Sequence, residues 1–129
     1  MAEIRVNRKI RVLIVEDDLE QQGLVSRYLS ADGFDVRTTD SPMGVTNITR
    51  DFQPDVILLD LDLPAYNGDK VVSLLRQRGF KTKILIFSAS DETRLSKIGK
   101  DVQADGWLSK STPLITLGIK LKQIAYSHG

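Results

Sequence analysis

The sequence contains no cysteine, and only one histidine and one tryptophan occur among its 129 residues. The absence of cysteine excludes disulfides, thiolate nucleophiles and zinc–thiolate sites. Neither sign of charge dominates, because 18 basic and 17 acidic side chains give a net charge of +1. Such a balance provides no general attraction for nucleic acid or for an anionic membrane. No apolar run approaches the ~18–20 residues that span a bilayer, and no signal-peptide core is present. We therefore expect a cytoplasmic protein that has no membrane contact and does not bind nucleic acid directly.

The chain does contain five short apolar segments, and four of them end on reactive polar side chains. Amphipathic helical patterns fill the gaps between these segments, and turn residues separate them. The predicted strands are 10–16, 34–39, 55–60, 83–88 and 105–109, and the predicted helices are 19–31, 42–52, 68–78, 92–103 and 113–127. Strict alternation of strand and helix indicates an α/β fold with a parallel sheet covered on both faces. No linker or repeat interrupts the pattern, so residues 1–129 are predicted to form one domain.

Three polar residues are candidate helix caps. Ser41-Pro42 and Thr112-Pro113 each place a hydroxyl at the expected N-cap and a proline at the first helical position. Asp18 precedes the first predicted helix and is suited to the same role.

The carboxyl ends of parallel strands meet at one edge of a sheet, where ligands bind in open α/β folds. Glu16 and Asp17 end the first predicted strand, and Asp60 ends the third. Several carboxylates at one edge repel each other unless a cation is present, and Mg²⁺ prefers such oxygen ligands. We expect Asp17 and Asp60 to bind Mg²⁺ directly and Glu16 to act through water or by positioning a ligand. The alternative is that the acidic run is only a polar turn before a helix.

A carboxylate beside Mg²⁺ is also a suitable nucleophile toward a phosphoryl donor, and Asp60 is the candidate. The hydroxyl of Ser88 and the ammonium of Lys110 end two further predicted strands at the same edge. Each of them is suited to neutralise or to bond a phosphoryl oxygen. The pattern therefore indicates a divalent-metal and phosphoryl site.

With these residues in this order, the chain resembles the receiver domain of two-component response regulators. The resemblance covers about Lys9 to Tyr126 and is based on Leu13-Ile14-Val15-Glu16-Asp17-Asp18, on Pro54-Asp55-Val56-Ile57-Leu58-Leu59-Asp60-Leu61-Asp62-Leu63-Pro64 with Asn67-Gly68, on Ser88-Ala89, and on Asp105-Gly106-Trp107-Leu108-Ser109-Lys110. It implies a doubly wound (βα)₅ sheet with strand order 2-1-3-4-5 and a core of about 9–126. It also implies that Asp60 accepts a phosphoryl group from a sensor histidine kinase or a histidine phosphotransfer protein. Such a domain is a signalling phosphoacceptor that assists its own phosphorylation and slow dephosphorylation, rather than an enzyme.

The resemblance also implies a role for each residue of the site. Glu16 and Asp17 match the acidic pair of the family, and the backbone carbonyl of Asp62 is expected to complete the protein ligands of Mg²⁺, for which Mn²⁺ can substitute. Asp62 and Ser90 occupy positions that tune the lifetime of the phosphoryl group. Ser88 is the expected switch hydroxyl, and Trp107 is the expected switch aromatic.

Two residues depart from the family pattern. Ser111 follows Lys110 where the family usually carries a proline joined by a cis peptide bond. A cis bond without proline costs about 2.5–4 kcal/mol, so this bond is expected to be trans or strained. Trp107 is bulkier than the usual tyrosine or phenylalanine, which is expected to restrict its swing.

The last predicted helix has a second apolar face, formed by Ile115, Ile119 and Tyr126, beside its core stripe. This face favours a homodimer formed through helix 92–103, strand 105–109 and helix 113–127, although scattered exposed apolar residues are an equally good explanation. Two other functions stay open: a receiver-like interaction module that is never phosphorylated, and a TOPRIM-like Mg²⁺-dependent nucleotidyl-transfer domain.

Overall fold

The computed structural model of the chain describes residues 8–61, 68–101 and 103–127. Its five strands form one parallel sheet in the order β2-β1-β3-β4-β5, as predicted. The strands are β1 (Arg11–Val15), β2 (Asp35–Thr39), β3 (Val56–Leu59), β4 (Lys83–Ser88) and β5 (Gly106–Ser109). The helices are α1 (Leu19–Ala31), α2 (Val45–Phe52), α3 (Gly68–Gln77), α4 (Glu92–Asp101) and α5 (Leu114–Tyr126), with a 3₁₀ turn, η2 (Pro42–Gly44), before α2.

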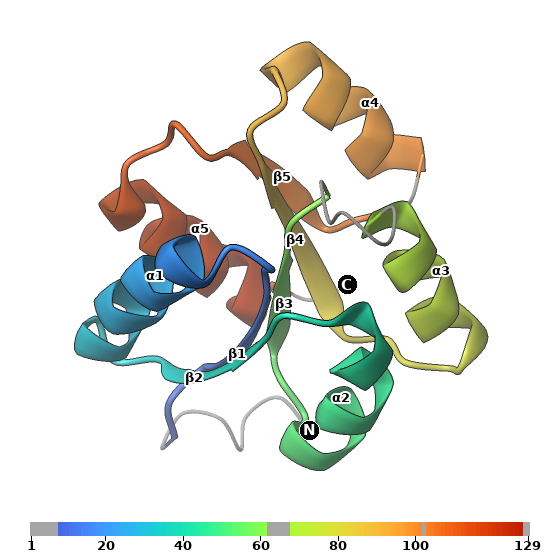
Figure 1. Cartoon of the computed structure of the whole chain (residues 1–129), viewed down its shortest axis with the longest axis horizontal. Coiled ribbons are helices and arrows are strands. Elements are labelled where there is room, and N and C mark those ends of the chain that lie inside the picture. Colours follow the sequence, from blue (N-terminus) through green and yellow to red (C-terminus); the bar gives the residue numbers. More distant parts are fainter. Residues whose placement is uncertain (1–7, 62–67, 102, 128–129) are drawn as a thin grey trace.

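The helices cover both faces of the sheet, with α1 and α5 on one side and α2, α3 and α4 on the other (Figure 1). Alternate residues of the central strands point to opposite faces, which divides the core into two clusters. Leu13, Ile57 and Ile86 belong to the cluster under α2, α3 and α4. Ile14, Leu58 and Phe87 belong to the cluster under α1 and α5. The sheet is therefore buried on both faces, and its carboxyl edge is left to carry the site.

Two predicted helix starts differ from the structure. Ser41 does cap a helix, since its Oγ accepts a hydrogen bond from the amide of Met43, but the capped turn is the 3₁₀ turn η2. The prediction for Thr112 is wrong, because Pro113 itself occupies the N-cap of α5 and no side chain caps that helix. The amide of Thr112 instead donates to the carbonyl of Ser109 at 2.9 Å, so Thr112 belongs to the preceding turn.

Candidate functional site

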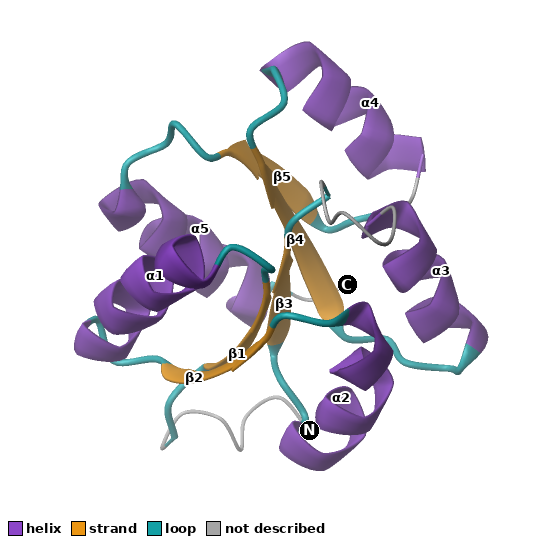
Figure 2. Cartoon of the chain, in the orientation of Figure 1, coloured by secondary structure: helices purple, strands orange, loops and turns teal. Residues whose placement is uncertain are grey.

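The strands β1, β3, β4 and β5 lie side by side in the sheet (Figure 2). The predicted site residues stand at or just after the carboxyl ends of these four strands. Backbone hydrogen bonds continue just beyond the strand ends and fix the residues there. The amide of Glu16 donates to Thr39 O at 3.0 Å, and the amide of Asp60 donates to Val15 O at 3.1 Å. The amide of Lys110 donates to the carbonyl of Ser88 at 2.8 Å. The sheet itself therefore positions the site.

Three carboxylates converge at this edge. Glu16, Asp17 and Asp60 each offer one oxygen, and these oxygens all lie within 4.8 Å of one another. Glu16 and Asp60 are only 4% and 5% exposed, which makes their mutual repulsion costly without a cation. A compact set of hard oxygen donors beside solvent fits a divalent cation such as Mg²⁺. Asp62, whose carbonyl is the predicted further ligand, lies outside the described residues.

The ammonium of Lys110 reaches two of these carboxylates. Its Nζ donates to Glu16 Oε1 at 2.5 Å and lies 3.2 Å from Asp60 Oδ2. The peptide bond between Lys110 and Ser111 is trans. The Ser109 hydroxyl holds this turn, because Ser109 Oγ accepts a hydrogen bond from the Ser111 amide at 3.2 Å. The missing proline therefore does not prevent the ammonium from reaching the acidic cluster.

The acidic cluster and Lys110 alter each other's protonation. Burial raises the pKa of Glu16 from 4.5 to about 7; the hydrogen bond from Lys110 opposes this shift, and Asp60 adds to it. Burial alone would lower the pKa of Lys110, but the hydrogen bond to Glu16 and the charge of Asp60 outweigh burial and raise it. Lys110 is therefore a permanent cation at neutral pH, while Glu16 titrates close to neutrality.

Ser88 ends β4 and is completely buried. Its Oγ donates to Ser90 Oγ at 3.4 Å and accepts from the Ser90 amide at 3.3 Å. Arg94, in the first turn of α4, also donates to Ser90 Oγ at 3.3 Å. Ser90, a predicted lifetime-tuning residue, thus connects Ser88 to α4. No sequence pattern points to Arg94, because its contact with Ser90 depends on the path of the chain between β4 and α4.

Trp107, in β5, is half-buried and packs against the cluster under α2, α3 and α4. The helix that it meets is α4, at Gly99. The structure thus places the predicted switch aromatic on the strand next to that of Ser88, with α4 as its neighbour.

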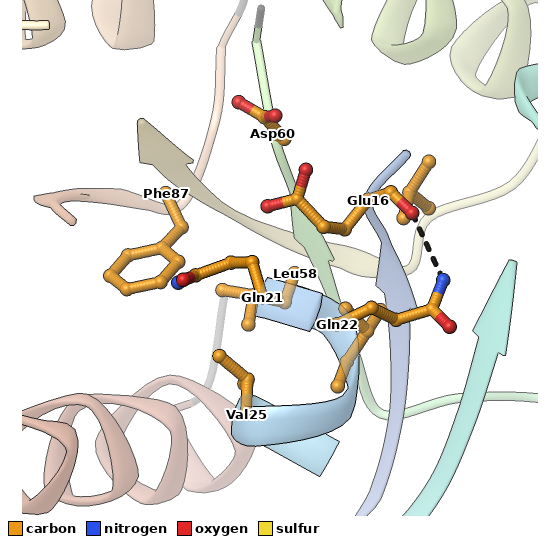
Figure 3. Close-up of a pocket in the computed structure, with 9 residues that line it drawn as sticks. Glu16, Gln21, Gln22, Val25, Leu58, Asp60 and Phe87 are labelled. Atoms are coloured by element: carbon orange, nitrogen blue, oxygen red, sulfur yellow. Dashed lines mark hydrogen bonds between the residues drawn. The ribbon is translucent and has the colours of Figure 1, made fainter. Parts of the chain in front are cut away.

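A small cavity of about 10 Å³ lies beside the acidic cluster, on the α1 side of the sheet (Figure 3). Glu16 and Asp60 line one end of it, and Gln21, Gln22 and Phe87 are among the other residues that line it. Gln22 Nε2 donates to the backbone carbonyl of Glu16 at 2.9 Å and so holds the end of β1 against α1. Sequence analysis missed both glutamines, because polar residues in the first turns of a helix are ordinary.

Asp18 caps α1 as predicted. Its Oδ1 accepts hydrogen bonds from the amides of Glu20 and Gln21 at 3.0 and 3.1 Å. Asp18 therefore stabilises the start of α1 beside the site, whereas Glu16 and Asp17 belong to the acidic cluster.

A parallel sheet of order 2-1-3-4-5, with an acidic cluster and a lysine at its carboxyl edge, defines a receiver-type α/β domain. Residues 12–122 match the sequence profile of the response regulator receiver domain, and the chain belongs to that family. The receiver domain is a signalling domain, so this membership excludes the TOPRIM-like alternative.

Relatives and solved structures agree with this assignment. The chain is 32% identical over 116 residues to the TorCAD operon transcriptional regulatory protein TorR of Escherichia coli, an alignment that covers 89% of this chain and 50% of TorR. It is 37% identical over 83 residues to the cell cycle transcriptional regulator CtrA of Caulobacter vibrioides, covering 64% of this chain and 36% of CtrA. The structure of chemotaxis protein CheY4 of Vibrio cholerae superimposes with a TM-score of 0.81 at 28% identity, covering 90% of this chain and 98% of that one. The chain thus spans about half the length of the first curated relatives that it matches.

Proposed function

We propose that this receiver domain accepts a phosphoryl group on Asp60 from a phosphohistidine, on a sensor histidine kinase or a histidine phosphotransfer protein. The contact that carries the proposal is Lys110 Nζ, which lies 3.2 Å from Asp60 Oδ2 while it bonds Glu16. The ammonium partly neutralises the carboxylates, and it would also lie within reach of a phosphoryl group on Asp60. This contact, together with the neighbouring carboxylates, supports the proposal that Asp60 is the nucleophile and that the cluster binds a metal ion.

In the proposed step, an oxygen of Asp60 attacks the phosphorus of the donor. The new O–P bond forms as the N–P bond breaks, and the imidazole nitrogen of the donor keeps the bonding electron pair and takes up a proton. Lys110 offsets the charge on the phosphoryl oxygens, and Ser88 donates a hydrogen bond to one of them. Mg²⁺, or Mn²⁺ in its place, held by Glu16, Asp17 and Asp60 with the carbonyl of Asp62, would supply further positive charge to those oxygens.

The same site is proposed to act as a switch. Ser88 would leave its contact with Ser90 and move toward the phosphoryl group, and Trp107 would turn into the space that this movement vacates. This change requires only that the phosphoryl group bond one arrangement better than the other. Asp62 and Ser90, which follow Asp60 and Ser88 by two residues along the chain, are proposed to set the lifetime of the phosphoryl group.

The surface of α4, β5 and α5 is the proposed readout of this switch. Ile115, Ile119 and Tyr126 of α5 are 63%, 52% and 56% exposed, as expected for a face that a second copy would cover. We propose a homodimer through this surface. Sedimentation with and without beryllofluoride, a phosphoryl mimic, tests the dimer, and a monomer under both conditions would contradict it.

None of the described helices has the length and apolar character to cross a membrane. We propose a cytoplasmic domain made of residues 1–129 that contacts protein partners and not nucleic acid. In this proposal the domain catalyses no reaction beyond its own phosphorylation and slow dephosphorylation.

Intact-mass measurement after incubation with phosphoramidate and Mg²⁺ tests the function. We expect one phosphoryl adduct that hydroxylamine removes, and we expect none with EDTA or in Asp60→Asn. An unmodified wild-type protein that still binds Mg²⁺ would contradict phosphorylation and would favour a receiver-like module that only binds partners.

A further inference from the structure

Gly99 lies in the last turn of α4, and glycine is a weak helix former. It is buried against the indole of Trp107. A Cβ atom built on Gly99 would lie no more than 3.0 Å from three indole carbons, Cδ2, Cε3 and Cζ3. Carbon atoms pack at about 3.5–4.0 Å, so no side chain fits between this helix and the ring. The indole of Trp107 therefore occupies the space that a side chain at position 99 would need.

Among the glycines of the described helices, Gly99 differs in what a side chain would meet. A Cβ on Gly68, at the start of α3, would also be too close to its surroundings, but its nearest atom would be the Leu61 backbone Cα at 2.8 Å. A Cβ on Gly23 in α1 would meet only the flexible guanidinium of Arg27, at 3.1 Å. A Cβ on Gly118 in α5 would meet the carboxylate end of Asp32, at 2.8 Å. Only at Gly99 is the obstacle a ring that is itself half-buried in a core.

α4 is also tied to the phosphoryl site at its other end. Arg94 in the first turn donates to Ser90, and Ser90 in turn is hydrogen-bonded to Ser88. The helix is therefore linked to Ser88 indirectly, through Arg94 and Ser90, and it contacts Trp107 directly at Gly99. Trp107 is half-buried, so a ring displaced from Gly99 would move most readily toward its solvent-exposed side.

We propose that Gly99 is a positioning residue that forms a seat for Trp107, and that this seat restrains phosphorylation by holding the indole and α4 in the resting arrangement. The second half of this proposal rests on the proposed function, since it requires Asp60 to be phosphorylated. Because Gly99 has no side chain, there is room beside α4 for the bulky indole of Trp107, the residue proposed to move in the switch. The resting arrangement of Trp107 and α4 therefore depends on the absence of a methyl group at position 99.

The seat is tested by Gly99→Ala in the unphosphorylated protein, with Gly23→Ala as the matched control. Trp107 is the only tryptophan of the chain, so its fluorescence reports directly on the ring. We expect acrylamide quenching to increase and emission to shift to longer wavelength in Gly99→Ala, because the ring is displaced outward, and we expect neither change in Gly23→Ala. Unchanged quenching in Gly99→Ala would overturn the seat.

A second pair of variants distinguishes a clash between Gly99→Ala and the indole from a general loss of stability. Phenylalanine lacks the positions of Cε3 and Cζ3, so Trp107→Phe removes most of the obstruction. Gly99→Ala should lower the urea midpoint in the wild-type background and should leave it unchanged or raised in the Trp107→Phe background. A loss of equal size in both backgrounds, including failure of both to fold, would overturn the proposal.

The restraint is tested by the rate of adduct formation with phosphoramidate and Mg²⁺. A methyl group that disfavours only the resting arrangement should accelerate phosphorylation, by roughly tenfold if the two-state balance shifts by that factor. The acceleration should vanish when Trp107→Phe is also present. An unchanged rate in a Gly99→Ala protein whose quenching has increased would overturn the restraint and leave the seat. Absence of any adduct in the wild type would reject the proposed function and the restraint, while the fluorescence result would still decide the seat.

Discussion

Removal of the Lys110 ammonium should destabilise the metal-free protein far more than removal of an equivalent surface lysine. Lys110→Met keeps an apolar stem of similar size and deletes the charge that lies 3.2 Å from Asp60 Oδ2 and 2.5 Å from Glu16 Oε1. At an effective dielectric constant of about 20, the pair at 3.2 Å attracts by about 5 kcal/mol before the cost of desolvation is subtracted. Breaking a buried pair on one side leaves an unpaired charge and typically costs about 3–5 kcal/mol. Because Lys110 is 21% exposed, we expect a loss of about 2–4 kcal/mol at pH 8.

Lys122 provides the matched control. Its Nζ lies at the same 3.2 Å from Asp32 Oδ2, but the two side chains are 44% and 32% exposed. Exposed pairs contribute between zero and about 1 kcal/mol, so Lys122→Met should lose no more than about 1 kcal/mol. Urea unfolding in EDTA, analysed with a shared slope, measures both variants. Equal losses in the two variants, or a Lys110→Met protein as stable as the wild type, would refute the electrostatic reasoning.

The loss in Lys110→Met should also depend on pH. The pKa of Glu16 is about 7 in the folded protein, so at pH 5.5 Glu16 carries a proton and repels Asp60 less. The destabilisation should therefore be smaller at pH 5.5 than at pH 8. A loss that does not change between these pH values would show that the missing ammonium acts through packing and not through charge.

Three further predictions concern stability. Asp18→Ala removes the acceptor of two helix-start amides and should cost about 1 kcal/mol in urea unfolding, whereas an unchanged midpoint would show that α1 does not need its cap. Thr49→Val should stabilise the protein by about 1 kcal/mol, because Thr49 Oγ1 is buried and has no hydrogen-bond partner within the described part of the chain; a loss would indicate that the hydroxyl is satisfied. Finally, the pKa of Glu16 rises from 4.5 to about 7 on folding, so the folded state holds a proton that the unfolded chain lacks between these values. The free energy of unfolding in EDTA should therefore decrease as the pH rises from 4.5 to 7, and Glu16→Gln should flatten this slope.

The sequence was sufficient for features that depend on neighbours along the chain or on strand ends. The order of elements, the capping by Asp18 and the placement of Glu16, Asp60 and Lys110 at one edge all follow from local patterns and from the geometry of parallel strands. The strand order came from family resemblance and agrees with the observed pairing. These features need no knowledge of how helices pack on the sheet.

Features that depend on tertiary approach could not be predicted from the sequence. Thr112 precedes a proline in the usual capping pattern, yet the turn after β5 uses its amide elsewhere and leaves Pro113 at the helix start. Gly99 appears in the sequence only as a weak helix residue, and its meaning becomes visible when α4 lies against Trp107. The contact of Arg94 with Ser90 has the same origin, since it requires the actual path of the chain between β4 and α4.

Chemical trapping can identify the residue that accepts the phosphoryl group, which we propose to be Asp60. Borohydride reduces an aspartyl phosphate to homoserine, so peptide mapping after phosphoramidate, Mg²⁺ and borohydride identifies the modified residue. We expect homoserine in place of Asp60 and nowhere else, with no product in EDTA or in Asp60→Asn. Homoserine in place of Asp17 or Asp62, or no product in a protein that binds Mg²⁺, would contradict it.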